Sequence, residues 1–158
     1  MENNQIDSID REIIESLKDD ARKSYLQVAK ELGVSNSMVH QRIGRLKKLD
    51  IITKEKLSIN PKELGFDTCS FAYIELREPV NDLRPVADQL EKIPEIVECN
   101  HISGSHTLLV KIYCKNNNHL RIVLYDKIHQ IPGVVGTNTF ISFETAFKRE
   151  VPIFEHGL

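Results

Sequence analysis

The chain has 158 residues, of which 41% are hydrophobic and 28% charged, and its formal net charge is -2. This length allows one ordinary domain or two small ones, and the apolar content excludes a disordered chain. The sequence has no apolar run of the roughly 20 residues that span a bilayer, no secretory signal pattern, and no C-x-x-C pair among its three cysteines. We therefore expect a cytoplasmic protein with reduced thiols and no membrane partner.

Three short helices are predicted within the first 50 residues. The first covers residues 8–17 and begins with Ser8 as its cap. The second covers residues 24–32 and begins at Ser24, with Gln27 in the position of a capping box. The apolar stripe of this second helix consists of Leu26, Ala29 and Leu32.

A glycine-containing turn leads into the third predicted helix. Gly33 ends the preceding helix, because glycine adopts the left-handed conformation of a helix end at little cost. Ser35 then caps a helix over residues 35–49, which carries four cations and no acid. Its inward stripe consists of Val39, Ile43 and Leu46. Two helices, this turn and a basic helix are typical of a helix-turn-helix motif, whose last helix lies in the DNA major groove.

The outward side of the third helix carries residue types that contact DNA. Gln and Arg pair bidentately with adenine and guanine edges, which favours Gln41 and Arg45 as base contacts. We expect Lys48 and the start of the second helix to contact phosphates. The predicted DNA-binding residues are Ser24, Tyr25, Ser35, Asn36, Ser37, His40, Gln41, Arg42, Arg45 and Lys48.

Two points about this helix have alternative interpretations. A basic helix is often only a solvated surface, although the preceding turn and the absence of acids weigh against that interpretation here. Gly44 lies inside the helix, where glycine costs about 1 kcal/mol relative to alanine. It either lets the backbone approach DNA closely or is a small packing residue.

The second part of the chain alternates between strand and helix patterns. The expected domains are residues 1–52 for DNA binding, 53–66 as a connector strand, 67–145 for ligand binding and oligomerisation, and 146–158 as a tail. A short strand-like stretch over residues 51–58 overlaps the start of this connector, and the pattern breaks at Asn60-Pro61. The elements beyond it are strand 69–76, helix 83–93, strands 96–102 and 108–113, helix 119–128 and strand 134–143.

This β-α-β-β-α-β order predicts an α+β, ferredoxin-like domain, a four-stranded antiparallel sheet with both helices on one side. Both faces of the expected sheet are apolar. In strand 108–113, Val110 and Ile112 point to one face while Leu109 and Tyr113 point to the other. Because two helices cover only one face, we expect a second copy of the domain to cover the other, so that the chain forms a dimer.

The ordered set of motifs resembles the Lrp/AsnC family, the leucine-responsive and feast/famine regulators. The matching stretches are IDREII at 9–14, ARKSY at 21–25, VSNSMVHQRI at 34–43, RL at 45–46, NPKELG at 60–65 and IPGV at 131–134. The resemblance implies a sequence-specific DNA-binding transcriptional regulator with a winged or simple helix-turn-helix. It also implies a C-terminal effector domain of the RAM type, which pairs through its sheet into dimers that assemble into octamers.

The resemblance further implies that a free amino acid binds the effector domain and alters assembly or DNA affinity. The family's binding loop has a glycine followed three positions later by Asp. Gly104 matches this pattern, and Thr107 stands where Asp is usual. An Asp can pair with an ammonium group, which a Thr hydroxyl cannot replace. The candidate effector-binding residues are Ser103, Gly104, Ser105, His106 and Thr107.

Two other functions remain open from the sequence. A DNA-organising protein without a small-molecule effector would suit the missing Asp, and an enzyme on the ferredoxin-like domain is a remote alternative. The sequence has no G-x-S-x-G elbow, no H-E-x-x-H pattern and no Gly-rich phosphate loop. We therefore expect no catalytic residues, no metal and no cofactor.

Overall fold

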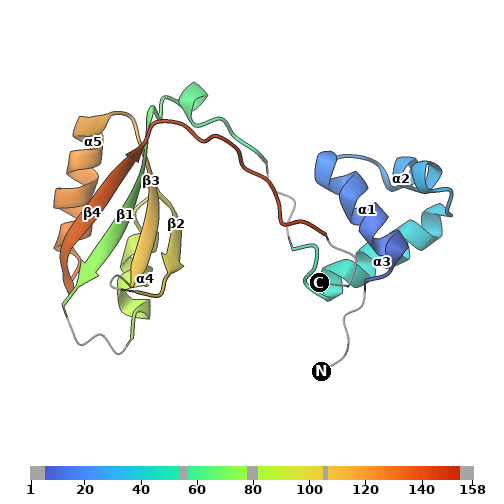
Figure 1. The fold of residues 1–158 in the computed structure, drawn as a ribbon, viewed down its shortest axis with the longest axis horizontal. Coiled ribbons are helices and arrows are strands. Elements are labelled where there is room, and N and C mark those ends of the chain that lie inside the picture. Colours follow the sequence, from blue (N-terminus) through green and yellow to red (C-terminus); the bar gives the residue numbers. More distant parts are fainter. Residues whose placement is uncertain (1–5, 54–56, 78–81, 105–106, 154–158) are drawn as a thin grey trace. The chain divides into compact units, whose positions relative to one another are not determined.

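A computed structural model describes residues 6–53, 57–77, 82–104 and 107–153, and the chain divides into two compact units (Figure 1). The first unit comprises Met1–Ser58 and Lys148–Leu158, and the second comprises Ile59–Phe147. Within the described residues, no helix is long and apolar enough to span a membrane.

The first unit contains three helices, α1 (Ser8–Asp19), α2 (Tyr25–Leu32) and α3 (Asn36–Lys48). Ser24 and Ser35 cap α2 and α3, as predicted from the sequence. Gly33 ends α2 with a φ of 66°, in the left-handed region where glycine meets no Cβ strain. Asp7 caps α1 instead of the predicted Ser8, because Asp7 and Asp10 each accept a hydrogen bond from the other's backbone N–H.

The three helices enclose a small apolar core. The predicted inward residues of α3, Val39, Ile43 and Leu46, are all buried. The prediction for Leu26 is wrong, since this side chain is 53% exposed. The buried face of α2 is centred on Val28 and Ala29. The core cluster of this unit consists of Ile13, Val28, Ala29, Val39 and Ile43.

The second unit is the predicted ferredoxin-like fold (Figure 1). Its strands pair antiparallel in the order β2-β3-β1-β4. Their bounds are Thr68–Leu76 for β1, Ile96–His101 for β2, Leu108–Cys114 for β3 and Val134–Ser142 for β4. The helices are a 3-10 turn at Lys62–Leu64, α4 at Arg84–Glu91 and α5 at Asn117–Ile122, which continues as a π-helical turn, Val123–Lys127, and a 3-10 turn, Ile128–Gln130.

Two predicted elements differ from the structure. The described residues of the predicted strand 51–58 are not in a strand, and residues 54–56 lie outside the description. The backbone N–H groups of Ile51 and Ile52 instead donate to the carbonyl of Leu46 and close the end of α3. The predicted helix 119–128 begins earlier, because the Asn116 side chain caps α5 by accepting from the His119 N–H.

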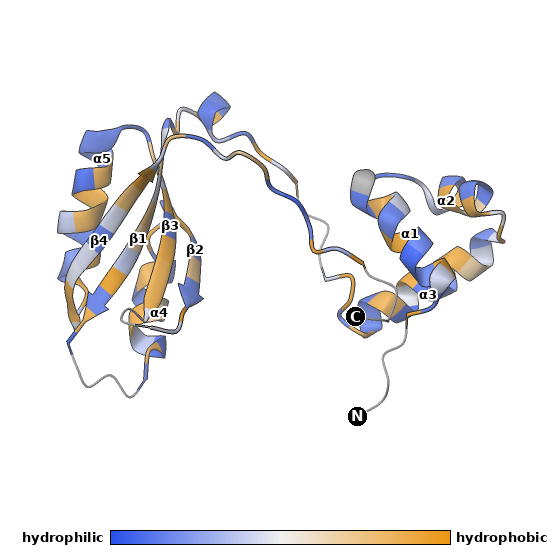
Figure 2. Ribbon diagram, in the orientation of Figure 1, coloured by the Kyte–Doolittle hydropathy of each residue, from blue (hydrophilic) through white to orange (hydrophobic). Residues whose placement is uncertain are grey.

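The two faces of the sheet differ in what covers them. The helices α4 and α5 both pack on one face of the sheet. Strand residues such as Ile74, Val110 and Ile112 are buried there together with Leu90 of α4 and Val123 after α5. The other face has no cover among the described residues of the chain. It carries Phe71, Tyr73, Leu109, Lys111, Tyr113 and Phe140, and we call this set the open face. Figure 2 shows the hydrophobic colouring that runs along β3.

Both outer strands carry an irregularity. The pairing of β2 with β3 shifts register between Ile96 and Glu98, and the pairing of β1 with β4 shifts between Glu75 and Leu76. Each shift leaves one residue of the outer strand without a counterpart: Val97 in β2 and Val135 in β4.

Candidate functional site

The outward face of α3 is polar and exposed. Ser35 caps the helix by accepting a hydrogen bond at its Oγ from the Met38 N–H, at 3.2 Å, and the same Oγ lies 3.0 Å from that of Ser37. Gln41 lies one turn beyond Ser37 and is exposed. The exposed residues of this face are Asn36, Ser37, His40, Gln41, Gly44, Arg45 and Lys48.

Both arginines of α3 are paired with carboxylates at the start of α1. Arg42 Nη1 lies 2.5 Å from Asp7 Oδ2 and 3.1 Å from Asp10 Oδ1. Arg45 Nη2 donates to the other oxygen of Asp10. Asp10 is fully buried, whereas the Arg45 side chain is 45% exposed. The hydrogen bond from Arg42, followed by the one from the Asp10 backbone, holds the pKa of Asp7 below its ordinary value.

This network connects α3 to α1 across 35 residues of sequence. From the sequence we expect Arg42 to contact phosphate or a neighbouring acid, and the structure gives it the acids Asp7 and Asp10. The pairing of Arg45 with Asp10 was not predicted. A signal for it does exist in the sequence. Asp10 lies three residues before Ile13 and seven before Leu17, on the apolar stripe of α1. A carboxylate on such a stripe needs a charged partner when the helix packs, and α3 supplies two.

Gly44 lies on the exposed side of α3 without close neighbours. A Cβ at this position would meet no heavy atom of the described residues within 4 Å, apart from the backbone of its own helix. The interpretation of Gly44 as a small packing residue is therefore wrong. Close approach to DNA is the interpretation that the geometry leaves open.

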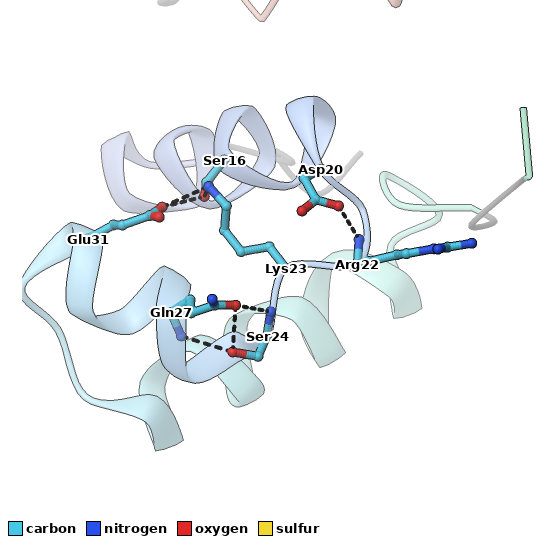
Figure 3. Close-up of polar contacts among 7 residues, drawn as sticks. All are labelled: Ser16, Asp20, Arg22, Lys23, Ser24, Gln27 and Glu31. Carbon is cyan, nitrogen blue, oxygen red and sulfur yellow. Dashed lines mark hydrogen bonds and ion pairs between the residues drawn. The ribbon is translucent and has the colours of Figure 1, made fainter.

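The start of α2 is organised by its capping box (Figure 3). Ser24 Oγ accepts from the Gln27 N–H at 3.2 Å, and Gln27 Oε1 accepts from the backbone N–H and the hydroxyl of Ser24 at 3.0 and 2.9 Å. The next residue, Tyr25, is half-buried, and its ring meets that of His40 edge-on at 4.7 Å between centroids. The contact places His40 of α3 beside the N-terminus of α2.

A second polar cluster holds α1 against α2 (Figure 3). Lys23 Nζ lies 2.9 Å from Glu31 Oε2 and 3.0 Å from Ser16 Oγ, and Ser16 Oγ donates to the same carboxylate oxygen at 3.0 Å. The hydrogen bonds from Lys23 and Ser16 hold the pKa of Glu31 below its ordinary value. Lys23 thus serves the packing of the unit, while the Arg22 side chain points away from the cluster.

The loop between β2 and β3 is the candidate effector site. The Ile102 N–H donates to the Thr107 carbonyl at 3.0 Å and closes the loop. Gly104 has a φ of 113°, which L-residues rarely adopt. Ser103 and Gly104 are exposed, and Thr107 is half-buried. Ser105 and His106 lie outside the described residues, so the structure describes three of the five predicted effector residues.

The sequence reasoning missed a charged cluster in the second unit. Glu95 Oε1 accepts a hydrogen bond from Lys127 Nζ at 2.7 Å and lies 3.0 Å from His119 Nε2. His119 Nδ1 in turn accepts from the Lys115 N–H at 3.2 Å. These contacts fasten the residue before β2 to α5 and its π-helical turn. Within the described residues, no group of three or more His, Cys, Asp or Glu side chains is placed to hold a metal ion.

Two family models match the chain. A winged helix-turn-helix DNA-binding model matches residues 6–53, and a model described as the Lrp/AsnC ligand binding domain matches residues 71–152. The regulatory protein AsnC of Escherichia coli is 33% identical over 151 residues, which cover 96% of this chain and 99% of AsnC. An HTH-type transcriptional regulator of Pyrococcus horikoshii is 35% identical over 149 residues, 94% of this chain and 97% of its own.

Solved structures show the same architecture. The structure of Escherichia coli AsnC matches with a TM-score of 0.86 at 32% identity and covers 93% of this chain and 98% of its own. A transcriptional regulator of Neisseria meningitidis, solved as a complex with L-Met, matches with a TM-score of 0.87 at 17% identity and covers 94% and 97%. At that identity the second likeness concerns the fold.

Proposed function

The chain belongs to the Lrp/AsnC family of DNA-binding transcriptional regulators, and on that premise we propose that the outer face of α3 contacts the major groove of its operator. The exposed, acid-free polar face of α3, held by two other helices, carries the proposal. Residues 1–52 then form the DNA-binding domain and residues 67–145 the effector domain. Relatives that are transcriptional regulators support a role without catalysis.

The proposed DNA contacts divide by position. Asn36, Ser37, His40 and Gln41 face the bases from the first turns of α3. Lys48 at the end of the helix neutralises a phosphate. The remaining candidates, Ser24, Tyr25, Ser35, Arg42 and Arg45, cap a helix, pack at the start of α2 or pair with carboxylates of α1, so they orient the helices beside the DNA backbone.

We propose that the effector domain pairs with a second copy through the open face. Tyr73 and Phe140 pack edge-on there at 5.9 Å between ring centroids. Lys111 Nζ lies 5.5 Å from the ring centroid of Phe71 and 5.3 Å from that of Tyr113. A dimer presents two copies of α3 to related half-sites, and dimers then assemble into octamers. Chromosomal DNA in bacteria and archaea lies in the cytoplasm, which is the location we propose.

The loop over residues 102–107 is the proposed effector site, and a small molecule bound there alters DNA affinity or assembly. The L-Met complex of the Neisseria meningitidis regulator supports an amino acid as the class of ligand. Thr107 favours the second candidate, a DNA-organising protein without an effector, because it cannot form the charge pair with an ammonium group.

Competitive titration distinguishes these functions. The full chain is titrated against the DNA upstream of its own gene, at physiological salt, with a scrambled duplex of equal length and composition as competitor. A sequence-specific regulator binds the upstream duplex despite the competitor, and free amino acids are then screened for a shift in that affinity. Equal binding to both duplexes would favour the DNA-organising function. Binding to neither would contradict DNA recognition through α3.

A further inference from the structure

The geometry of α3 points to a division of labour within the helix, which rests on the proposed DNA binding. We infer that Gln41 reads the base pair that it faces, as an A·T pair, while Arg42 and Arg45 are positioning residues fixed on Asp7 and Asp10. The sequence alone favours both Gln41 and Arg45 as base contacts, and the structure separates them.

Arg45 is held by an ion pair with Asp10. Its Nη2 donates to Oδ2 of the fully buried Asp10, and Oδ1 of the same carboxylate accepts from Arg42. Bidentate recognition of guanine requires the planar guanidinium to turn its donors toward O6 and N7 of the base. If Arg45 turned away, Arg42 would keep one oxygen of Asp10, but the other oxygen would lose its charged donor while remaining buried, which is unfavourable. Arg45 therefore keeps its contact with Asp10 when the helix meets DNA.

Gln41 is available to contact DNA. Its side chain is exposed, and no hydrogen bond within the described part of the chain occupies its carboxamide. The neighbouring positions along this face leave it room. Ser37, one turn earlier, is small and directed to Ser35, and Gly44, almost one turn later, has no side chain. A base-pair edge can thus approach the Gln41 carboxamide past Ser37 and Gly44, while Arg45, one turn beyond Gln41, is held on Asp10.

The Gln41 carboxamide has a donor and an acceptor that match adenine. Its nitrogen donates to N7 of adenine while its oxygen accepts from N6, a bidentate match. Guanine offers acceptors at both O6 and N7, so the carboxamide oxygen has no donor there. We therefore expect the protein to prefer an operator in which each half-site has an A·T pair opposite Gln41.

Selection from a random duplex library tests this assignment with the full chain. We expect the wild-type protein to enrich an A·T pair at one position in each half-site. In Gln41→Ala, the preference at that position alone falls by roughly tenfold or more, as expected for a lost bidentate contact. Gln41 is exposed, so circular dichroism and thermal unfolding should match the wild type.

Two substitutions of Arg45 separate positioning from reading. Arg45→Lys keeps a cation for Asp10 but loses the planar fork, so base preference and affinity should both stay near the wild type. Arg45→Met keeps the apolar stem and removes the charge, so the unfolding midpoint falls and affinity drops alike for all sequences.

A G·C pair enriched by the wild type and lost in Arg45→Lys would overturn the inference, as would a preference unaffected by Gln41→Ala. A wild-type protein that enriches no sequence would contradict the proposed function itself, which distinguishes the two failures.

Discussion

The Glu95 carboxylate forms ionic contacts that connect the residue before β2 to the segment of α5 and its π-helical turn. Its side chain is 12% exposed and receives hydrogen bonds from Lys127 and His119. Burial by itself raises the pKa of a carboxyl, but the hydrogen bonds from Lys127, its own backbone and His119 outweigh it. The pKa of Glu95 in the folded protein therefore lies below its ordinary value of 4.5.

A lowered pKa makes this contact a source of acid sensitivity. The contribution of Glu95 to stability is fully present above its ordinary pKa and is lost as the pH falls through the lower folded value. We expect Glu95→Gln to reduce the free energy of unfolding at pH 7 by about 2 kcal/mol, since it weakens charge-assisted hydrogen bonds. Urea unfolding at pH 7 and at several lower values measures both effects. The difference between variant and wild type should shrink in acid; a constant difference would contradict the assignment.

Cys114 is a buried free thiol whose reactivity can be predicted. Burial raises the pKa of its thiol to about 11, with the Glu95 carboxylate adding to the rise. Since the thiolate is the nucleophile, Cys114 should resist alkylation at neutral pH in the native protein and react in urea. Peptide mass analysis after iodoacetamide treatment, with and without urea, measures this. Cys99 is followed in the same digest as an exposed residue whose thiol pKa burial also raises. Equal labelling of Cys114 in both conditions would contradict its burial.

Residues of the first unit show which contacts a sequence can predict. The caps at Ser24 and Ser35 depend on neighbours within three positions, so local residue types are sufficient to find them. The pair of Asp10 and Arg45 joins residues 35 apart, and only the packing of α1 against α3 creates it. The site prediction therefore identified the exposed face of α3 and allowed an acid as the partner of Arg42, but it assigned Arg45 to a base without knowing its partner.

Among the helices, Gly33 ends α2 and Gly44 lies inside the continuous helix α3, so substitutions of these two glycines should have opposite effects on stability. Gly33 ends α2 at a φ of 66°, whereas Gly44 lies within α3 at an ordinary φ. Gly33→Ala should destabilise the protein by about 1 kcal/mol, because an L-residue is strained in the left-handed region. Gly44→Ala should stabilise it by about 0.5–1 kcal/mol, because glycine loses more backbone entropy in a helix.

Urea unfolding of both variants checks these opposite signs. DNA affinity of Gly44→Ala provides a separate readout: where the backbone of α3 approaches DNA closely, the added methyl weakens binding although the free protein is more stable. A destabilised Gly44→Ala would contradict the open surroundings of this position.

The strands were easier to predict than the helix that follows β3. Apolar residues run almost continuously along β1 and β3, which marks them as strands of a sheet with two apolar faces, and burial alternates along both strands because their side chains alternate. The predicted helix 119–128 is helical throughout but changes to a π-helical turn at Val123 and a 3-10 turn at Ile128. A periodicity of 3.6 residues describes the buried side chains of this segment, not its changes of hydrogen-bond pattern.

At the scale of the whole molecule, the open face determines the expected assembly. Phe140 is exposed on this face and contacts Tyr73. Phe140→Glu should convert the dimer to a monomer, because each dimer would bury two carboxylates without partners in an apolar interface. Multi-angle light scattering measures the mass. Tyr125→Glu is the matched control, since Tyr125 is similarly exposed but lies on the helical side of the sheet. A dimeric Phe140→Glu would contradict pairing through this face.

The register shifts in β2 and β4 have a consequence for behaviour at high concentration. An outer strand with continuous hydrogen-bonding groups is a template on which a second molecule can add a strand, and repeated addition leads to fibrils. The unpaired Val97 and Val135 interrupt that template on both sides of the sheet. Copies of this chain are thereby discouraged from extending the sheet sideways without end, which agrees with the proposed pairing through the open face.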